Sequence, residues 1–150
     1  MAGEYAVVYW DASAILSVLF KDPHTRVARR WVAREGIHFM SSLAWAEVCA
    51  VVSRMKREHV LSELTESGAL EAVRQGPWVR MSGLPDWEVT ATLCRRWALR
   101  GADLWHLAAA KTLQREESDL VLLTFDERLG QCAQGEDMSP GTVPRRSRSK

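Results

Sequence analysis

Four acidic residues lie in stretches that are otherwise apolar. They are Asp11 after VVYW, Glu47 within LAWAEVCAVV, Asp103 at the start of ADLWHLAAA, and Asp126 after LVLLTF. A carboxylate in apolar surroundings is costly unless it is protonated, paired or bound to a metal. Four such carboxylates in one chain therefore indicate one shared site that holds a cation. Because their separations along the sequence are long, only the fold can bring them together.

The type of ligand indicates the type of ion. Carboxylates without a Cys or His ligand pattern suit Mg²⁺ or Mn²⁺ rather than zinc. Such ions bind phosphate oxygens and activate water for in-line attack at phosphorus. Without the ion, mutual repulsion among the acids should raise their pKa values and loosen the site.

Each acid also has a purely structural interpretation. Asp11 and Asp103 would each cap the helix that they open, and the stretch TFDE around Asp126 matches a capping box. Glu47 lies inside a predicted helix, where capping does not apply. A structural Glu47 would therefore need a buried Arg or Lys partner.

The elements that must position these acids alternate between strands and helices. Short apolar runs predict strands at residues 5–10, 37–40, 78–81 and 120–124, with a last edge strand at 142–143. Periodicity, caps and breakers predict helices at about residues 11–20, 24–34, 42–57, 62–74, 85–99, 102–114 and 126–132. This alternation predicts an α/β fold with a mostly parallel sheet. In such sheets, sites form outside the carboxyl ends of the strands, which is where the four acids fall.

Size and composition set the domain organisation. A chain of 150 residues with 47% hydrophobic and 26% charged residues is typical of one globular domain. We place the domain at residues 1–134 and expect a turn-rich, basic C-terminal tail at 135–150, disordered in part. The last six residues, RRSRSK, leave a body with 16 Lys and Arg against 19 Asp and Glu, a net charge of −3. The tail is either a disordered terminus or an arm that follows phosphates.

The cysteines and the apolar stretches indicate the cellular compartment. Three cysteines without C-x-x-C spacing leave one unpaired in any disulfide scheme, which is typical of a reducing compartment. No apolar stretch approaches the length of about 18 residues that predicts a membrane span, and the N-terminus lacks a signal pattern. We therefore expect a cytoplasmic protein.

Four segments of the chain resemble the signature segments of PIN-domain ribonucleases. They are WDASAIL, SSLAWAEV, LRGADLWHLAAA and LLTFDERL, in that order, and the likeness spans residues 5–129. The chain most resembles the VapC toxins of bacterial and archaeal toxin–antitoxin pairs. This resemblance implies a three-layer α/β/α sandwich with a short central sheet and a Mg²⁺- or Mn²⁺-dependent endoribonuclease activity.

The resemblance also implies roles for individual residues. The four acids would bind the metal and act in catalysis. Ser13 and Thr124 match small hydroxyl positions that would support the site. His106 matches the D-x-x-H of the third segment, one helical turn after Asp103. It either takes part in the chemistry or is a packed, hydrogen-bonded histidine.

The partners implied by the resemblance are an RNA substrate, a cognate VapB-like antitoxin that fills the cleft, and a second copy of the chain. RNA binding needs phosphate contacts, for which three basic clusters are candidates: Arg26, Arg29 and Arg30; Arg54, Lys56 and Arg57; Arg95, Arg96 and Arg100. Each cluster could instead be a solvated surface. The acidic body favours a particular loop or fold of RNA over non-specific binding. The rings of Trp10, Trp45 and Trp105 are bulky for their positions and would narrow the cleft or form a dimer face.

Two other functions remain open. One is a PIN fold that binds RNA or protein with little catalysis, although all four acids are present. The other is a phosphatase or phosphotransferase with Asp11 as nucleophile. Such sites have a second Asp two residues later, where this chain has Ser13, and there is no G-x-x-x-x-G-K phosphate loop. We therefore expect an endoribonuclease toxin.

Overall fold

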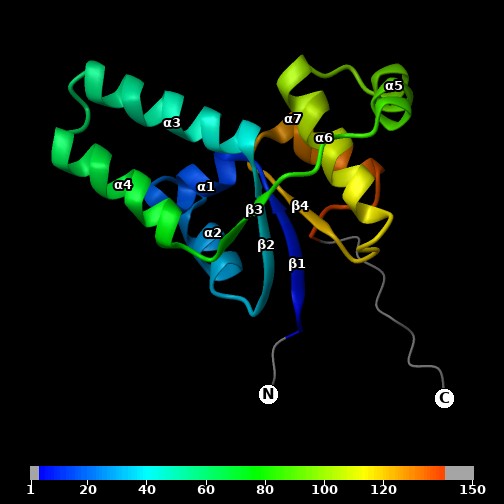
Figure 1. Ribbon diagram of the computed structural model, residues 1–150, viewed down its shortest axis with the longest axis horizontal. Coiled ribbons are helices and arrows are strands. Elements are labelled where there is room, and N and C mark those ends of the chain that lie inside the picture. The colour runs from blue at the N-terminus through cyan, green and yellow to red at the C-terminus, as the bar shows by residue number, and fades with distance from the viewer. Residues whose placement is uncertain (1–3, 141–150) are drawn as a thin grey trace.

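A four-stranded parallel sheet forms the centre of the protein (Figure 1), whose computed structural model describes residues 4–140. Its strands are β1 (Ala6–Trp10), β2 (Gly36–Ser41), β3 (Trp78–Met81) and β4 (Val121–Leu123). They lie in the order β3-β2-β1-β4, and each neighbouring pair is parallel. The carboxyl ends of the strands therefore meet at one edge of the sheet, at the top of Figure 1.

Helices cover both faces of the sheet, so the predicted three-layer α/β/α sandwich is confirmed. On one side lie α1 (Ala12–Leu19), α2 (Thr25–Val32), α3 (Ser42–Arg57) and α4 (Glu63–Gln75). On the other lie α5 (Trp87–Arg96), α6 (Gly101–Gln114) and α7 (Glu127–Gly135). Successive side chains of a strand point to opposite faces. Accordingly Val8 and Trp10 belong to the core under α1–α4, and Tyr9 belongs to the core under α5–α7.

The predicted element boundaries differ from the structure mainly near the C-terminus. The helix predicted at 85–99 ends at Arg96, because the backbone of Trp97 is extended. The helix predicted at 126–132 continues to Gly135 and buries Ala133 in the same core as Cys132. The edge strand predicted at 142–143 and the basic segment RRSRSK lie outside the described residues.

Residues just after the proposed domain boundary pack onto the domain. Glu136 is 2% exposed and accepts two hydrogen bonds from Nη1 of Arg96, at 2.5 and 2.7 Å. Met138 is fully buried, and its carbonyl accepts the N–H of Leu122 at 2.8 Å. These contacts tie residues 136–138 to β4 and α5. The boundary at residue 134 stays a prediction.

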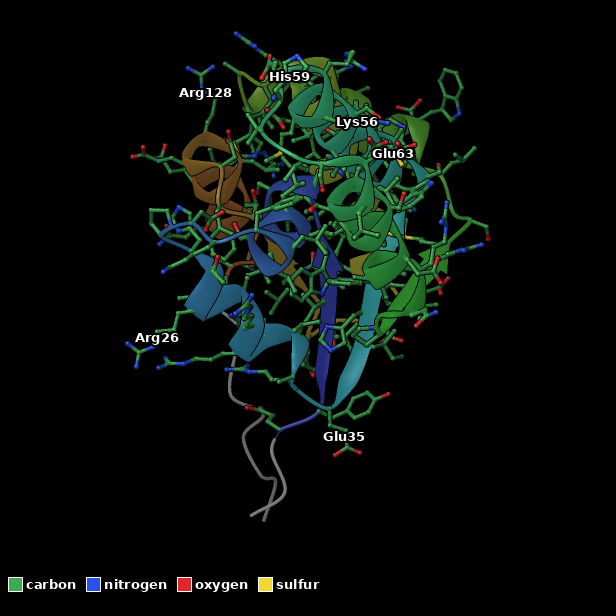
Figure 2. The ribbon with its side chains drawn as sticks, turned by 90° about the vertical axis from the view of Figure 1, so that its left-hand side faces the viewer. Arg26, Glu35, Lys56, His59, Glu63 and Arg128 are labelled. Atoms are coloured by element: carbon green, nitrogen blue, oxygen red, sulfur yellow. The ribbon has the colours of Figure 1, made fainter. Side chains whose placement is uncertain are left out.

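Helices α3 and α4 form a hairpin, and its turn lies far from the carboxyl ends of the strands (Figure 1). Lys56 and Glu63 lie close together at its turn (Figure 2), with 4.0 Å between Nζ and Oε1. Glu66 approaches the same ammonium group to 3.3 Å. In the described part of the chain, no helix has the length and apolar character needed to cross a membrane. The three cysteines are free thiols.

Candidate active site

Asp11 lies at the carboxyl end of β1 and is held there by three hydrogen bonds. Its Oδ1 accepts the Ser13 hydroxyl at 2.7 Å and the N–H of Ala14 at 2.9 Å, while Oδ2 accepts the Thr124 hydroxyl at 2.5 Å. The residue is 5% exposed. Burial raises the pKa of Asp11, and these donors oppose the rise. Asp11 therefore does cap α1, as its structural interpretation predicted, but its second oxygen is oriented by Thr124, just after β4.

The two predicted hydroxyl residues link the first and last strands. Ser13 lies 3.4 Å from Thr124, oxygen to oxygen, and the Ser13 hydroxyl also accepts the N–H of Phe125 at 3.0 Å. The Thr124 hydroxyl accepts the N–H of Asp126 at 3.1 Å. Ser13 and Thr124 thus fix the start of α1 against the loop that carries Asp126.

Glu47 has a histidine partner, where a purely structural role would have required an Arg or Lys. Its Oε1 lies 2.5 Å from Nε2 of His106, which comes from α6. The other ring nitrogen of His106 lies 2.7 Å from the hydroxyl of Tyr9, and that hydroxyl lies 3.3 Å from the Ser41 oxygen. His106 is 1% exposed. The structure therefore shows His106 as a packed, hydrogen-bonded residue that holds one of the four acids.

Asp103 and Asp126 complete the acidic group from the other side. Asp103 lies in the first turn of α6, but it does not cap that helix, because the N-cap is Arg100. Its pKa is raised first by burial, then by the charges of Asp126 and Glu47. Asp126 is exposed and caps α7, its Oδ1 accepting the N–H of Leu129 at 2.8 Å. All four acids are therefore within electrostatic reach of one another or of His106.

The donor set fits a hard divalent cation by its chemistry. The side chains at the site offer carboxylate oxygens, and repulsion from Asp126 and Glu47 helps to raise the pKa of Asp103. A cation would relieve that repulsion. However, among residues 4–140 no three His, Cys, Asp or Glu side chains converge closely enough to enclose one ion. Asp126 is exposed, and Asp103 and Glu47 are half-buried.

Tyr9 and Ser41 are the site residues that sequence reasoning missed. Tyr9 was read only as one residue of an apolar strand. A buried tyrosine hydroxyl normally needs a hydrogen-bond partner, and this was the available signal. Burial raises the pKa of Tyr9 well above its usual value, with smaller contributions from Asp11 and Glu47, so the hydroxyl stays protonated.

Some residues of the three basic clusters already form ion pairs with acidic residues of the protein, and others are exposed. Lys56 pairs with Glu66, and Arg96 is bound to Glu136. Arg26 is exposed and points away from the body of the protein (Figure 2). Arg100 lies close enough to lower the pKa of Asp103. Of the predicted phosphate contacts, Arg100 is therefore the one placed beside an acid of the site.

Comparison with known proteins gives a consistent result. The sequence profile of the PIN domain matches residues 8–134. The chain is 35% identical over 130 residues to two proteins of Mycobacterium tuberculosis, Ribonuclease VapC45 of strain CDC 1551 / Oshkosh and Ribonuclease VapC49 of strain H37Rv. Each match covers 82% of this chain and 86% of the relative.

Two solved structures share the fold. One is the Mycobacterium tuberculosis toxin VapC20, described as cleaving the sarcin–ricin loop, with a TM-score of 0.56, 13% identity, and coverage of 83% of this chain and 93% of that one. The other is PAE2754 from Pyrobaculum aerophilum, with a TM-score of 0.58, 16% identity, and coverage of 87% and 81%. At these identities the likeness concerns the fold alone.

Proposed function

Because the chain belongs to the PIN-domain family, we propose that it is a metal-dependent endoribonuclease and the toxin of a toxin–antitoxin pair. The observation that carries the proposal is the position of Asp11, Glu47 and Asp103. Each comes from a different element, and each is held or influenced electrostatically at the same edge of the sheet. The two mycobacterial relatives are named ribonucleases, which supports RNA as the substrate.

In this proposal the four acids hold Mg²⁺ or Mn²⁺. The bound ion supplies Lewis acidity toward a phosphate oxygen and lowers the pKa of an attacking water. The other site residues keep the acids in place. Ser13 and Thr124 fix both oxygens of Asp11, and His106 fixes one oxygen of Glu47. Such supporting hydrogen bonds orient metal ligands and tune their basicity.

The proposed partners follow from the family. We propose a VapB-like antitoxin that covers the cleft and places a basic side chain on the acids. A homodimer and a cytoplasmic location stay predictions. The chemistry at the cleft agrees with a basic inhibitor segment, because the acids repel one another in the absence of a cation and any opposite charge would relieve them.

The test is cleavage of purified total RNA by the wild type and by Asp11→Asn, each with Mg²⁺, Mn²⁺ or EDTA. We expect discrete fragments from the wild type with metal, and none from Asp11→Asn or in EDTA. Glu116→Gln is the matched control, because Glu116 is an exposed acid outside the site, and it should cleave like the wild type. Mapping the fragment ends names the target. Full activity of Asp11→Asn would refute the proposal.

The second candidate function is a PIN fold that binds RNA or protein with little catalysis. Undetectable cleavage of total RNA, together with RNA binding that is equal in Mg²⁺ and EDTA, would support this candidate over the nuclease.

A further inference from the structure

A pocket of about 250 Å³ lies at the carboxyl ends of β2 and β3. Its walls come from the start of α3, the end of α4 and the strand ends. They include two rings, two cations and two small hydroxyl residues: Trp45 and Trp78, Arg74 and Arg80, and Ser41 and Ser42. Sites for drug-sized ligands have about 300–1,000 Å³, so this pocket suits a smaller group.

The lining of the pocket combines aromatic surface with positive charge. The guanidinium carbon of Arg74 lies 5.6 Å from the centroid of the Trp45 ring. Arg74 and Arg80 are both exposed, and no lining residue is acidic. Glu71 approaches Arg74 to 3.4 Å from outside the lining, in an exposed ion pair of the weak kind. The pocket therefore favours a ligand with a flat ring and a negative charge.

The pocket is connected to the acids through Ser41. The Ser41 oxygen lies 3.3 Å from the Tyr9 hydroxyl, Tyr9 contacts His106, and His106 contacts Glu47. Ser41 therefore belongs both to the pocket wall and to the hydrogen-bond chain that ends at Glu47. A ligand in the pocket would therefore lie at the same edge of the sheet as the acids.

We propose that this pocket binds one unpaired nucleotide of the RNA substrate. The base packs on Trp45, and Arg74 and Arg80 contact its phosphate. Stacking on an aromatic ring and phosphate contacts by Arg are how unpaired nucleotides are commonly recognised. The inference rests on the proposed nuclease function. A segment of a protein partner is the competing occupant, but a lining with two exposed arginines and no acidic residue favours a negatively charged group.

The test measures binding in the Asp11→Asn background, so that the RNA stays intact. The probe is a fluorescein-labelled RNA of about twelve nucleotides that spans a cleavage site mapped in total RNA, and fluorescence anisotropy reports affinity. Trp45→Leu and Arg74→Gln should each weaken binding about five- to tenfold, while Trp45→Phe should stay within about twofold. Near-UV circular dichroism checks the fold of each variant.

Arg34→Gln is the matched control. The Arg34 guanidinium also lies over a tryptophan, 3.8 Å from the ring of Trp31, and Arg34 is exposed. It precedes β2, at the amino ends of the strands, where Figure 2 shows the neighbouring Glu35. This variant should bind within about twofold of its parent. An equal loss from Arg34→Gln would mean a general charge effect and would overturn the proposal.

A second measurement uses the same RNA with one base removed at each position in turn. Removal of the base that occupies the pocket should weaken binding to the parent about fivefold and should have no further effect on Trp45→Leu, because the two changes remove one contact. Unchanged RNA binding by Trp45→Leu and Arg74→Gln would overturn the proposal and leave the nuclease intact. The same two substitutions are also made in the active protein. If these variants cleave RNA normally but resist inhibition by the antitoxin, the pocket binds the protein partner. A wild type that neither cleaves nor binds RNA would refute the function itself.

Discussion

The hydroxyl of Tyr9 lies 2.7 Å from Nδ1 of His106, although 97 positions separate them in the chain. A carboxylate can only accept, so Nε2 of His106 donates to Glu47. The Tyr9 hydroxyl lies against Nδ1 of the same ring and donates to the Ser41 oxygen. One chain of hydrogen bonds thereby joins β1, α6 and α3 at the edge of the sheet where the acids lie.

Tyr9→Phe should lower the turnover number for RNA cleavage about tenfold, with a smaller change in KM. The substitution removes only the hydroxyl that fixes the orientation of His106, so Glu47 is held less firmly. Kinetics with a short cleaved RNA, repeated over a series of Mg²⁺ concentrations, would show a weaker apparent Mg²⁺ affinity as well. The control is Tyr5→Phe, because Tyr5 is 61% exposed. Equal kinetics for Tyr9→Phe and wild type would exclude a positioning role.

Asp103→Asn should raise the Tm by about 1–2 °C near pH 7 in EDTA. The pKa of Asp103 is raised by burial and by Asp126. The folded state therefore binds this proton more tightly than the unfolded state, and stability falls as the pH rises through the folded pKa. The gain from Asp103→Asn should accordingly shrink as the pH is lowered and the wild-type carboxyl protonates.

The pKa of Asp86 is shifted in the opposite direction, so Asp86 serves as the comparison for Asp103. Its pKa is lowered, first by the N–H of Val89 at the start of α5 and also by Arg115. Its contribution to stability is present above the unfolded pKa and is lost as the pH falls through the folded pKa. Asp86→Asn should therefore lower the Tm near pH 7, and the difference should vanish in acid. Thermal melts over a pH series check both signs, and shifts in the same direction would contradict the assignment.

Mg²⁺ and Mn²⁺ should raise the Tm of the wild type, because an ion that binds only the folded state stabilises it by mass action. A concentration of about one hundred times the Kd corresponds to about 2.7 kcal/mol. Asp103→Asn and Glu47→Gln should each reduce the shift, while Glu116→Gln should keep it. Differential scanning fluorimetry measures this without any RNA. An identical shift in all four proteins would place the bound ion elsewhere.

The fold was largely predictable because its strands and caps have local signals. Parallel strands that are buried on both faces are continuous apolar runs, and all four predicted strands within residues 4–140 are present. The positions of Asp11, Ser41 and Asp126 as helix N-caps follow from their side chains, each of which accepts a backbone N–H. The sequence could thus predict which edge of the sheet carries the acids.

The contacts across the site were less predictable, because they join residues on different elements. The sequence did not show that His106 is the partner of Glu47, and the metal-binding role of Glu47 stays a prediction. Trp10 was expected to narrow the cleft or form a dimer face, and this was wrong. It is fully buried, where it donates to Nδ1 of His38 at 3.0 Å and packs edge-on against Trp78. A run of apolar residues does not show on which face of the sheet each ring lies. That depends on how the strand is placed in the sheet.

Gly36→Ala should destabilise the protein by roughly 3 kcal/mol, because two effects act together. Gly36 has φ +152°, which side chains rarely adopt, and a Cβ built there would lie 1.9 Å from the carbonyl oxygen of Ala6. Ala6 and Gly36 are the first pair in the β1–β2 register. A side chain at this position must therefore push apart the two strands whose other ends carry Asp11 and Ser41.

Gly68→Ala is the matched substitution. Gly68 lies within α4, with no atom within 4 Å of an added Cβ. Alanine should therefore stabilise the protein by about 0.5–1 kcal/mol through its higher helix propensity. Urea unfolding gives both values from the midpoints, provided that the slopes agree. A loss of less than about 1 kcal/mol from Gly36→Ala would mean that β1 and β2 do not approach so closely. In that case the carboxyl ends of β1 and β2 could move independently of the first pair, Ala6 and Gly36. The hydrogen bonds that orient Asp11 and Glu47 would then not depend on that pair.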